Sequence, residues 1–299
     1  MMLVTGAAGF LGRAIATGLG PQAITLSRGP ASKHGDGLHI TADLTHPNAA
    51  QTVLSQLQGR EVSGIIHAAA VTPWSQEPDF SQDIVMAQAI VEIAKALQVR
   101  YVYFLSGWNV YDPQAAVPLS EDAAIRPTTP YGQSKADVEA YLSKNLGDTK
   151  LVNLRLASVY GPGQTSAGLL TNLVHAALTE KSLSIGAKQT RRDYLYVGDL
   201  VAALSELVTY TDLPSQNLNL GSGSSVSVQE VAETIASLYK ARAGTDISLQ
   251  YDEPLHEAAQ LDNVLAIGRA QRLGLLQQNT PFSDGLAAYI DWRIHENIL

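Results

Sequence analysis

The stretch that decides the fold is Met2-Leu3-Val4-Thr5-Gly6-Ala7-Ala8-Gly9-Phe10-Leu11-Gly12-Arg13. Residues 2–4 form a short apolar run typical of a buried strand, and apolar residues recur at helical spacing after the glycines. A strand, a glycine turn and a helix in this order present free backbone N–H groups and a helix N-terminus to a phosphate. Gly6 permits the tight turn, Gly9 lets the backbone approach a pyrophosphate, and Gly12 lets the helix pack closely on the strand. The spacing G-x-x-G-x-x-G differs from the G-x-G-x-x-G of many dehydrogenases, and a glycine triplet alone also suits an ordinary strand–helix turn.

Strand-like and helix-like segments alternate through the first half of the chain. After the opening strand we expect strands at 22–26, 38–42, 63–67, 101–105 and 150–156, and helices at 48–58, 80–97 and 131–146. Segment 107–130 holds four prolines without clear periodicity, which predicts a long loop over a site. This alternation predicts an α/β fold with a doubly wound parallel (Rossmann) sheet and helices on both faces.

The second half of the chain alternates less regularly between strand-like and helix-like segments. After about residue 157 the alternation loosens, and clusters of glycine and proline separate shorter elements. We expect a dinucleotide-binding domain formed by 1–157 with about 191–220, and a smaller α/β substrate-binding domain formed by 158–190 and 221–299.

Composition excludes several classes of function. The chain has 299 residues, of which 45% are apolar and 16% charged, and its formal net charge of −8 argues against a nucleic-acid-binding surface. No apolar run reaches the roughly 18 residues that span a bilayer, and no signal peptide is recognisable, so we expect a cytoplasmic protein without a membrane partner. The absence of cysteine excludes disulfides and thiolate chemistry, and the seven histidines show no metal-ligand spacing, so we predict no metal.

Tyr131-Gly132-Gln133-Ser134-Lys135 is the second informative stretch. Tyr131 and Lys135 lie four residues apart at the start of an expected helix, hence on the same face. A neighbouring ammonium favours the ionised form of a tyrosine. Such a pair can move the proton of a substrate hydroxyl while a cofactor takes or gives hydride. By itself, such a pair is far more often a surface tyrosine and lysine on an amphipathic helix.

Together with the glycine turn, these motifs resemble the extended short-chain dehydrogenase/reductase family, which includes nucleotide-sugar epimerases and dehydratases. Further motifs follow in the family's order: His67-Ala68-Ala69-Ala70, Leu154-Arg155-Leu156-Ala157-Ser158-Val159-Tyr160-Gly161-Pro162-Gly163, Arg192-Asp193-Tyr194, and Asn219-Leu220-Gly221-Ser222-Gly223. The resemblance implies a Rossmann fold and a catalytic pair formed by Tyr131 and Lys135. It implies that the cofactor is held by Gly6, Ala8, Gly9, Phe10, Leu11, Gly12, Ser27, Arg28, Asp43, Leu44, Ala68, Ala69, Ala70, Tyr131 and Lys135.

The sequence departs from the family at the group that orients the reacting oxygen. The family has Ser or Thr three residues before the Val of a Val-Tyr pair, and this position is Gly107. We assign the role to Ser106, one position earlier, although a strand-end serine satisfied by backbone is the alternative. The next positions are acidic in the family's dehydratases, but Trp108 and Asn109 cannot act as acids. Dehydration and decarboxylation are therefore disfavoured.

The resemblance implies NAD or NADP as the cofactor. An acidic residue at the end of the second strand would bind the ribose hydroxyls and repel a 2′-phosphate. The chain instead has Ser27 and Arg28 at this place, and arginine suits phosphate oxygens, which favours NADP. The alternative is an exposed loop arginine that leaves NAD binding unaffected.

For the substrate, the resemblance implies a nucleotide sugar, with Arg192 at the position of an arginine that binds the diphosphate. Ser158 stands where the family has Asn, and Asp262 completes the expected substrate-binding residues. A homodimer is expected through helices 80–97 and 131–146, because they resemble a pair that forms a four-helix interface in the family.

The reaction that fits these motifs is epimerisation of a nucleotide-linked hexose, most simply at C4, through transient oxidation. One alternative is an NADPH-dependent ketoreductase of a sugar nucleotide or a small carbonyl compound. A more remote alternative is a non-catalytic dinucleotide-binding sensor, which only Gly107 supports.

Overall fold

Contacts divide the chain into two units, which are described separately. The computed structural model describes residues 1–30, 37–57, 59–75, 77–179, 182–186, 189–251 and 262–296. Unit 1 comprises Met1–Ala115, Glu121–Leu156 and Leu200–Asn219. Unit 2 comprises Ala116–Ser120, Ala157–Asp199 and Leu220–Leu299.

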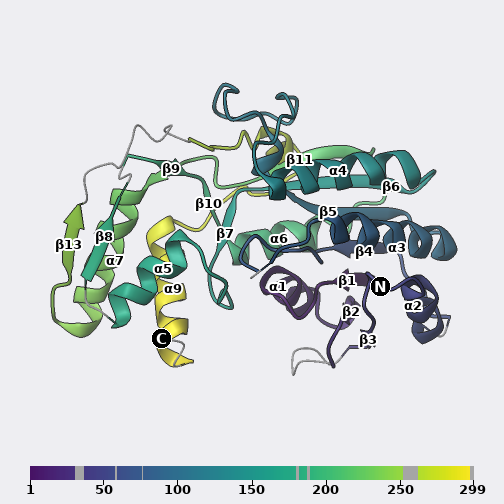
Figure 1. Ribbon diagram of the computed structural model, residues 1–299, viewed down its shortest axis with the longest axis horizontal. Coiled ribbons are helices and arrows are strands. Elements are labelled where there is room, and N and C mark those ends of the chain that lie inside the picture. Colours follow the sequence, from purple (N-terminus) through teal and green to yellow (C-terminus); the bar gives the residue numbers. More distant parts are fainter. Residues whose placement is uncertain are drawn as a thin grey trace. The chain divides into compact units, whose positions relative to one another are not determined.

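A seven-stranded parallel sheet forms the centre of unit 1, in the order β11-β6-β5-β4-β1-β2-β3 (Figure 1). Its strands are β1 (Met2–Thr5), β2 (Ala23–Ser27), β3 (His39–Thr41), β4 (Gly64–His67), β5 (Tyr101–Gly107), β6 (Lys150–Leu156) and β11 (Gln216–Leu220). The winding reverses at β1, which pairs with β2 on one side and β4 on the other. In open parallel sheets, ligands bind beyond the carboxyl ends of the strands at such a reversal. The register aligns Thr5 with His67 and His67 with Phe104. These three residues therefore lie side by side near the carboxyl ends of β1, β4 and β5.

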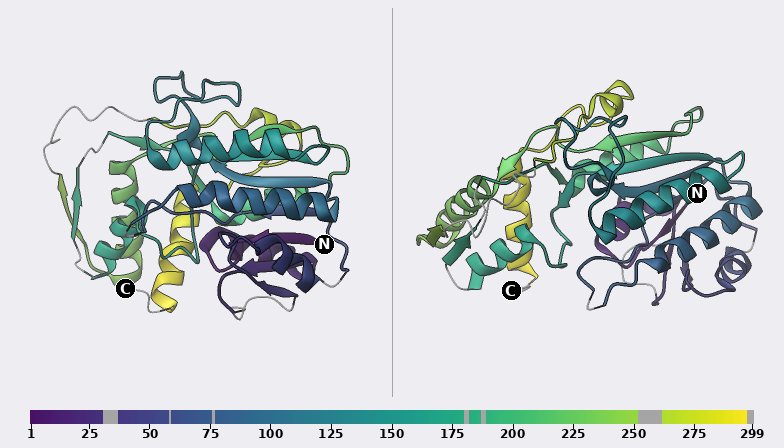
Figure 2. Two further views of the ribbon diagram at one scale, coloured as in Figure 1. Left: turned by 45° about the vertical axis from the view of Figure 1, so that its right-hand side comes forward. Right: turned by 45° about the horizontal axis from the view of Figure 1, so that its top comes forward.

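Helices cover both faces of the sheet. They are α1 (Phe10–Leu19), α2 (Ala49–Leu57), α3 (Ser81–Leu97), α4 (Pro130–Asn145) and α6 (Val197–Leu207). Helices α2, α3 and α4 share one hydrophobic core with the strands, and Figures 1 and 2 show α3 and α4 side by side. On the other face, Gly18 of α1 lies so close to Val201 of α6 that a Cβ at Gly18 would overlap the valine side chain.

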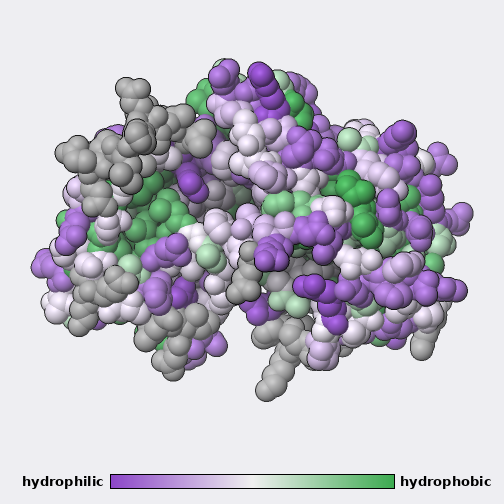
Figure 3. Space-filling view, viewed as in Figure 1, coloured by the Kyte–Doolittle hydropathy of each residue, from purple (hydrophilic) through white to green (hydrophobic). Residues whose placement is uncertain are grey.

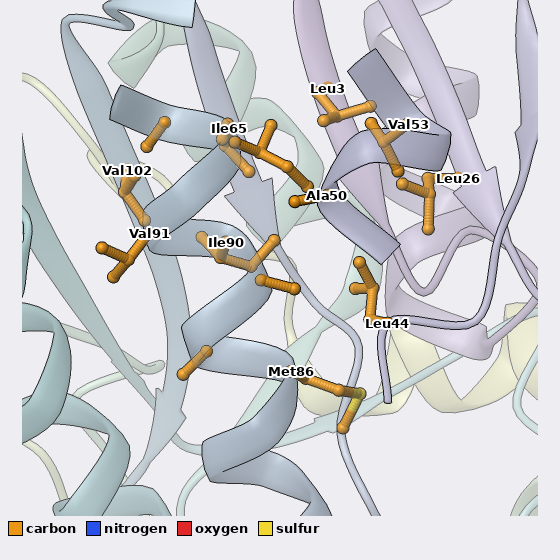
Figure 4. Packing of buried hydrophobic residues seen from close by; sticks show 14 of the residues in the cluster. Leu3, Leu26, Leu44, Ala50, Val53, Ile65, Met86, Ile90, Val91 and Val102 are labelled. Atoms are coloured by element: carbon orange, nitrogen blue, oxygen red, sulfur yellow. The ribbon is translucent and has the colours of Figure 1, made fainter. Parts of the chain in front are cut away.

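The core between α2, α3 and the sheet explains the apolar runs of the sequence. Strands buried on both faces are apolar at nearly every position, whereas the helices are apolar on one side only. Figure 4 shows how the two kinds of element interlock, with labels on Leu3, Leu26, Leu44, Ala50, Val53, Ile65, Met86, Ile90, Val91 and Val102.

Unit 2 is built from short strands and helices. They are β7 (Ser158–Tyr160), α5 (Leu169–Thr179), β8 (Ser182–Ile185), β9 (Arg191–Arg192), β10 (Tyr194–Tyr196), β12 (Val226–Ser227), α7 (Val228–Ala243), β13 (Ser248–Tyr251), α8 (Gly268–Arg272) and α9 (Phe282–His295). The strands form two-stranded sheets, and the apolar sides of α5, α7 and α9 meet in one core. Ser227 begins α7 with a capping box, since its hydroxyl accepts the N–H of Glu230 while the Glu230 carboxylate accepts the N–H of Ser227.

The predicted α/β fold with a doubly wound parallel sheet is confirmed, and the strand and helix positions differ by small shifts. Strand β2 begins at Ala23 because Gly20–Gln22 form a 3₁₀ turn with proline at its start. Segment 107–130 is not wholly irregular, since Trp108–Val110 form a second 3₁₀ turn and Tyr111 bridges Ile125.

The two units also differ from the predicted domain boundaries. Residues 191–199 belong to unit 2, because β9 pairs with β12 and β10 pairs with β7. Residues 116–120 belong to unit 2 as well, because Leu119 exchanges backbone hydrogen bonds with Val264 and Ala266.

The predicted homodimer would form through the exposed sides of α3 and α4. Figure 3 shows a small hydrophobic area over these helices, surrounded by hydrophilic residues. Val85 of α3 is 38% exposed, but most other exposed positions of the pair are polar: Ser81, Gln82, Gln88, Glu92, Lys95, Gln133, Asp137, Ser143 and Lys144. The dimer stays a prediction. Within the described part of the chain, no helix is long and apolar enough to cross a bilayer.

Candidate active site

The glycine turn after β1 is shaped by two glycines. Gly6 has φ +66°, and a Cβ there would lie 2.8 Å from the N of Ala69 and 2.9 Å from the carbonyl carbon of Ala68. A Cβ on Gly12 would overlap the carbonyl oxygen of Gly6. Only glycine fits either place, so the turn lies directly against the segment that follows β4.

The N-terminus of α1 is open. Its N-cap is Gly9, which has no side chain to accept the first helical N–H groups. Ala8 and Gly9 are exposed, and Phe10 and Leu11 are half-buried. The predicted phosphate-binding turn is therefore both accessible and rich in unused N–H donors.

Thr5 ties the ends of β1 and β4 together. Its hydroxyl oxygen accepts the N–H groups of Ala68 and Ala69, each at 3.1 Å, and lies 2.9 Å from Nδ1 of His67. Because the two amides occupy the oxygen's lone pairs, the single hydroxyl hydrogen goes to Nδ1. His67 is therefore neutral with its proton on Nε2. Burial, with a smaller contribution from the charge of Lys135, lowers the pKa of His67 to about 3.

We expect His67 to stay in this neutral form from pH 8 down to about pH 4. Since the pKa of His67 is lower in the folded state than the unfolded value of about 6.5, the unfolded chain takes up a proton first as pH falls. The free energy of unfolding should then decrease by up to about 1.4 kcal/mol per pH unit below pH 6.5. Imidazole ¹⁵N spectra, assigned with His67→Gln, measure the tautomer directly. A His67 signal that titrates near pH 6.5 would contradict this geometry.

Tyr131 and Lys135 are brought together at the start of α4. The hydroxyl of the N-cap Thr129 accepts the N–H of Gly132 at 3.0 Å and so fixes the first turn. Lys135 is 3% exposed, and its ammonium lies 5.6 Å from the ring centroid of Tyr131 and 5.0 Å from that of Phe104. It donates to the carbonyl of Leu105 at 3.2 Å, its single hydrogen bond to the described residues. A buried ammonium with two spare N–H groups is equipped to bind a ligand's oxygens.

Ser106, which the sequence analysis assigns to the reacting oxygen, donates its hydroxyl hydrogen to Glu139 instead, at 2.6 Å. Arg155 binds both oxygens of the same carboxylate, at 3.0 Å through Nε and 2.7 Å through Nη2. Burial opposes the charge of Arg155, but the hydrogen bonds and charge of Glu139 outweigh it and raise the pKa of Arg155. Arg155 also donates to the hydroxyl of Tyr111, which in turn donates to Asn219.

Sequence reasoning missed this ion pair and a second buried acid. Glu139 carried one available signal, its position four residues after Lys135 on the same side of α4. The second acid, Asp83 of α3, had no such signal in the sequence. Its carboxylate accepts the hydroxyl of Ser134 at 2.6 Å and the N–H of Val71 at 2.7 Å, and so joins α3, α4 and the segment after β4.

The residues predicted for the adenosine end of the cofactor have different environments. Ser27 is buried, and its hydroxyl donates to the carbonyl of Gly29 at 3.0 Å. Arg28 is exposed and has no hydrogen bond or ion pair within the described ranges. Asp43 accepts the N–H and hydroxyl of Thr45; these bonds, followed by the charge of Arg28, lower the pKa of Asp43. Leu44 belongs to the core.

In unit 2, the structure brings the three predicted substrate-binding residues into one neighbourhood. Ser158 pairs with Tyr194 across β7 and β10, two positions from Arg192. Asp262 precedes Asn263, whose side-chain oxygen accepts the N–H of Asp193. Oδ1 of Asp262 is buried and lacks a hydrogen-bond partner among the residues that the structure describes.

Arg191 and Arg192 are adjacent but differ in their contacts. Arg191 donates to the side chain and carbonyl of Ser225 and lies 3.2 Å from Glu230. Arg192 makes no hydrogen bond or ion pair with any described residue, so its guanidinium is the one available for an anionic ligand.

Comparisons with known proteins identify the family of the chain. The model of the NAD dependent epimerase/dehydratase family matches residues 2–221. The chain is 27% identical to the dTDP-4-dehydro-6-deoxyglucose reductase of Escherichia coli, over 86% of each sequence. It is 30% identical to the UDP-glucose 4-epimerase of Mycolicibacterium smegmatis, over 78% of this chain and 81% of that protein. Among solved structures it is similar to MoeE5 in complex with UDP-glucuronic acid and NAD, with a TM-score of 0.81, 29% identity and 99% of both chains covered. The chain therefore belongs to the NAD dependent epimerase/dehydratase family, as its resemblance to extended short-chain dehydrogenases/reductases predicts.

Proposed function

We propose that this chain is an NAD(P)-dependent epimerase that inverts a nucleotide-linked hexose at C4 through transient oxidation. The observation that carries the proposal is the buried ammonium of Lys135, which has one carbonyl partner among the described residues and lies beside the ring of Tyr131. Epimerisation needs a tyrosine that transfers the proton, with a lysine beside it, and needs no additional acid.

The residues around the glycine turn fit a dinucleotide. Gly6 and Gly12 leave no room for side chains, and the uncapped N-terminus of α1 supplies N–H donors for the pyrophosphate. The adenosine end would lie toward Asp43 and Leu44, and the ribose nearer the nicotinamide would lie over Ala68–Ala70. A bound nicotinamide would supply the acceptor and the donor of the hydride.

The chain's own groups handle the proton. Tyr131, as phenolate, would take the proton of the sugar hydroxyl and return it to the same oxygen at the end of the cycle. The ammonium of Lys135 lies beside the ring of Tyr131, and its spare N–H groups would bind ribose hydroxyls. In unit 2, Arg192 would bind the diphosphate of the sugar nucleotide, with Ser158 and Asp262 binding its other polar groups.

A reductase that uses NADPH is the second candidate, and the exposed guanidinium of Arg28 favours this alternative. Arg28 is exposed at the end of β2, where it could bind a 2′-phosphate and so select NADPH. The reductase relative from Escherichia coli is consistent with this alternative, and the epimerase relative with the first.

A screen of UDP-, dTDP- and GDP-hexoses with each cofactor tests the proposal. We expect NAD(H) to remain bound through purification and a 4-epimer pair to interconvert without net change in cofactor absorbance. Stoichiometric consumption of NADPH would identify the reductase instead. Cofactor binding without turnover of any nucleotide sugar or small carbonyl compound would identify a sensor and refute both enzymatic candidates.

A further inference from the structure

The turn that follows β5 has no side chain at its first position. Gly107 ends the strand with φ −150° and ψ 164°, which is extended backbone that any residue adopts. A Cβ added there would meet one neighbour among the described residues, Oδ1 of Asn109 at 3.2 Å. The backbone therefore does not require glycine, and the amide of Asn109 lies beside the space where a side chain would begin.

Asn109 also packs against the first turn of α4. A Cβ on Gly132 would overlap the carbonyl oxygen of Asn109 and lie 3.1 Å from its carbonyl carbon and 3.2 Å from its Cβ. Gly132 is the residue after Tyr131, so the absence of a side chain at Gly132 lets Asn109 come close to the start of the catalytic helix. The contacts at Gly107 and Gly132 place Asn109 between the end of β5 and the first turn of α4, which contains Tyr131.

The amide of Asn109 is unused. The residue is half-buried, and its side chain makes no hydrogen bond with any residue in the described ranges. Ser106 is 4% exposed, and its hydroxyl hydrogen is already donated to the carboxylate of Glu139, which Arg155 also binds. Of these two groups, only Asn109 has a hydrogen-bond donor to offer to a ligand.

We propose that the side-chain amide of Asn109 is the hydrogen-bond partner of the reacting substrate oxygen, next to Tyr131. The inference rests on the proposed function. An amide can accept a hydrogen bond from a hydroxyl and donate one to a carbonyl, so it suits an oxygen that alternates between these forms. It transfers no proton, and its effect is to orient the oxygen and stabilise negative charge on it during proton transfer.

Asn109→Leu tests the assignment, since it keeps a similar volume and removes the amide. We expect kcat to fall about 100-fold, with KM changed less than about threefold and an unaltered melting temperature. Introducing Gly107→Ser into this variant should restore at least part of the loss, since it supplies a hydroxyl at the vacant position. Gln133→Leu, on the exposed side of α4 next to Gly132, is the control and should leave kcat unchanged.

A second variant, Asn109→Asp, has nearly the same shape and covers the case in which the leucine variant fails to fold. A carboxylate accepts but does not donate, so kcat relative to that of the wild type should be low at neutral pH and rise as the pH is lowered and the group is protonated. If the wild type interconverts its substrate while both variants retain kcat within about twofold, this assignment is overturned and the proposed function stands. If the wild type converts no nucleotide sugar, both are overturned.

Discussion

Replacing Tyr131 by phenylalanine is expected to lower kcat about a thousandfold and to leave cofactor binding and the fold intact. The change removes the phenolic oxygen alone. The ring of Tyr131, with its edge contact to Phe80 at 6.1 Å and its position beside Lys135, is retained. Turnover of the substrate found in the screen, the absorbance of retained cofactor and the melting temperature together measure the effect.

Tyr141→Phe provides the matched control for this experiment. Tyr141 is a half-buried tyrosine of the same helix that packs against the core of unit 1 rather than beside Lys135. We expect its variant to keep wild-type kcat. If Tyr131→Phe retained more than a tenth of the activity, proton transfer would belong to another group.

Arg155→Met should have the largest effect on stability, lowering the free energy of unfolding by about 3–5 kcal/mol. Both members of the pair are buried, with side-chain exposures of 3% for Arg155 and 9% for Glu139. Without the guanidinium, the buried carboxylate of Glu139 retains one hydrogen-bond donor among the described residues, the hydroxyl of Ser106. Urea unfolding of the purified variant measures the loss.

Two further variants distinguish a buried charge from a loss of packing. Adding Glu139→Gln to Arg155→Met removes the uncompensated charge and should recover part of the lost stability. Arg126→Met breaks an ion pair in which the arginine side chain is 75% exposed, and should cost less than about 1 kcal/mol. An Arg155→Met protein as stable as the Arg126→Met protein would show that the buried pair contributes little.

The central sheet could be predicted because its signals are local. Most strands of unit 1 contain a short apolar run, and the alternation with helices leaves few possible arrangements. The edge strand β11, Gln216–Leu220, alternates polar and apolar residues and was not predicted. The glycine turn and the Tyr131–Lys135 pair were also predictable, since each lies within a single turn or a single helical repeat.

The remaining features depend on partners far apart in the chain. Ser106 lies 33 residues from Glu139 in sequence, and only the fold shows that its hydroxyl is already bonded. Asp83 reaches Ser134 over a separation of 51 residues. The assignment of 191–199 to unit 2 depends on two strands of two and three residues, which are too short to have a periodic pattern.

The close fit between Gly6 and the segment at Ala68 and Ala69 has a consequence for protein engineering. The same segment is held by the hydroxyl of Thr5, so the cofactor turn and the backbone after β4 form a single interlocked part. A loop graft intended to exchange one dinucleotide for another would therefore have to carry both segments together. Transplanting the turn alone would separate it from the surface that gives it its shape.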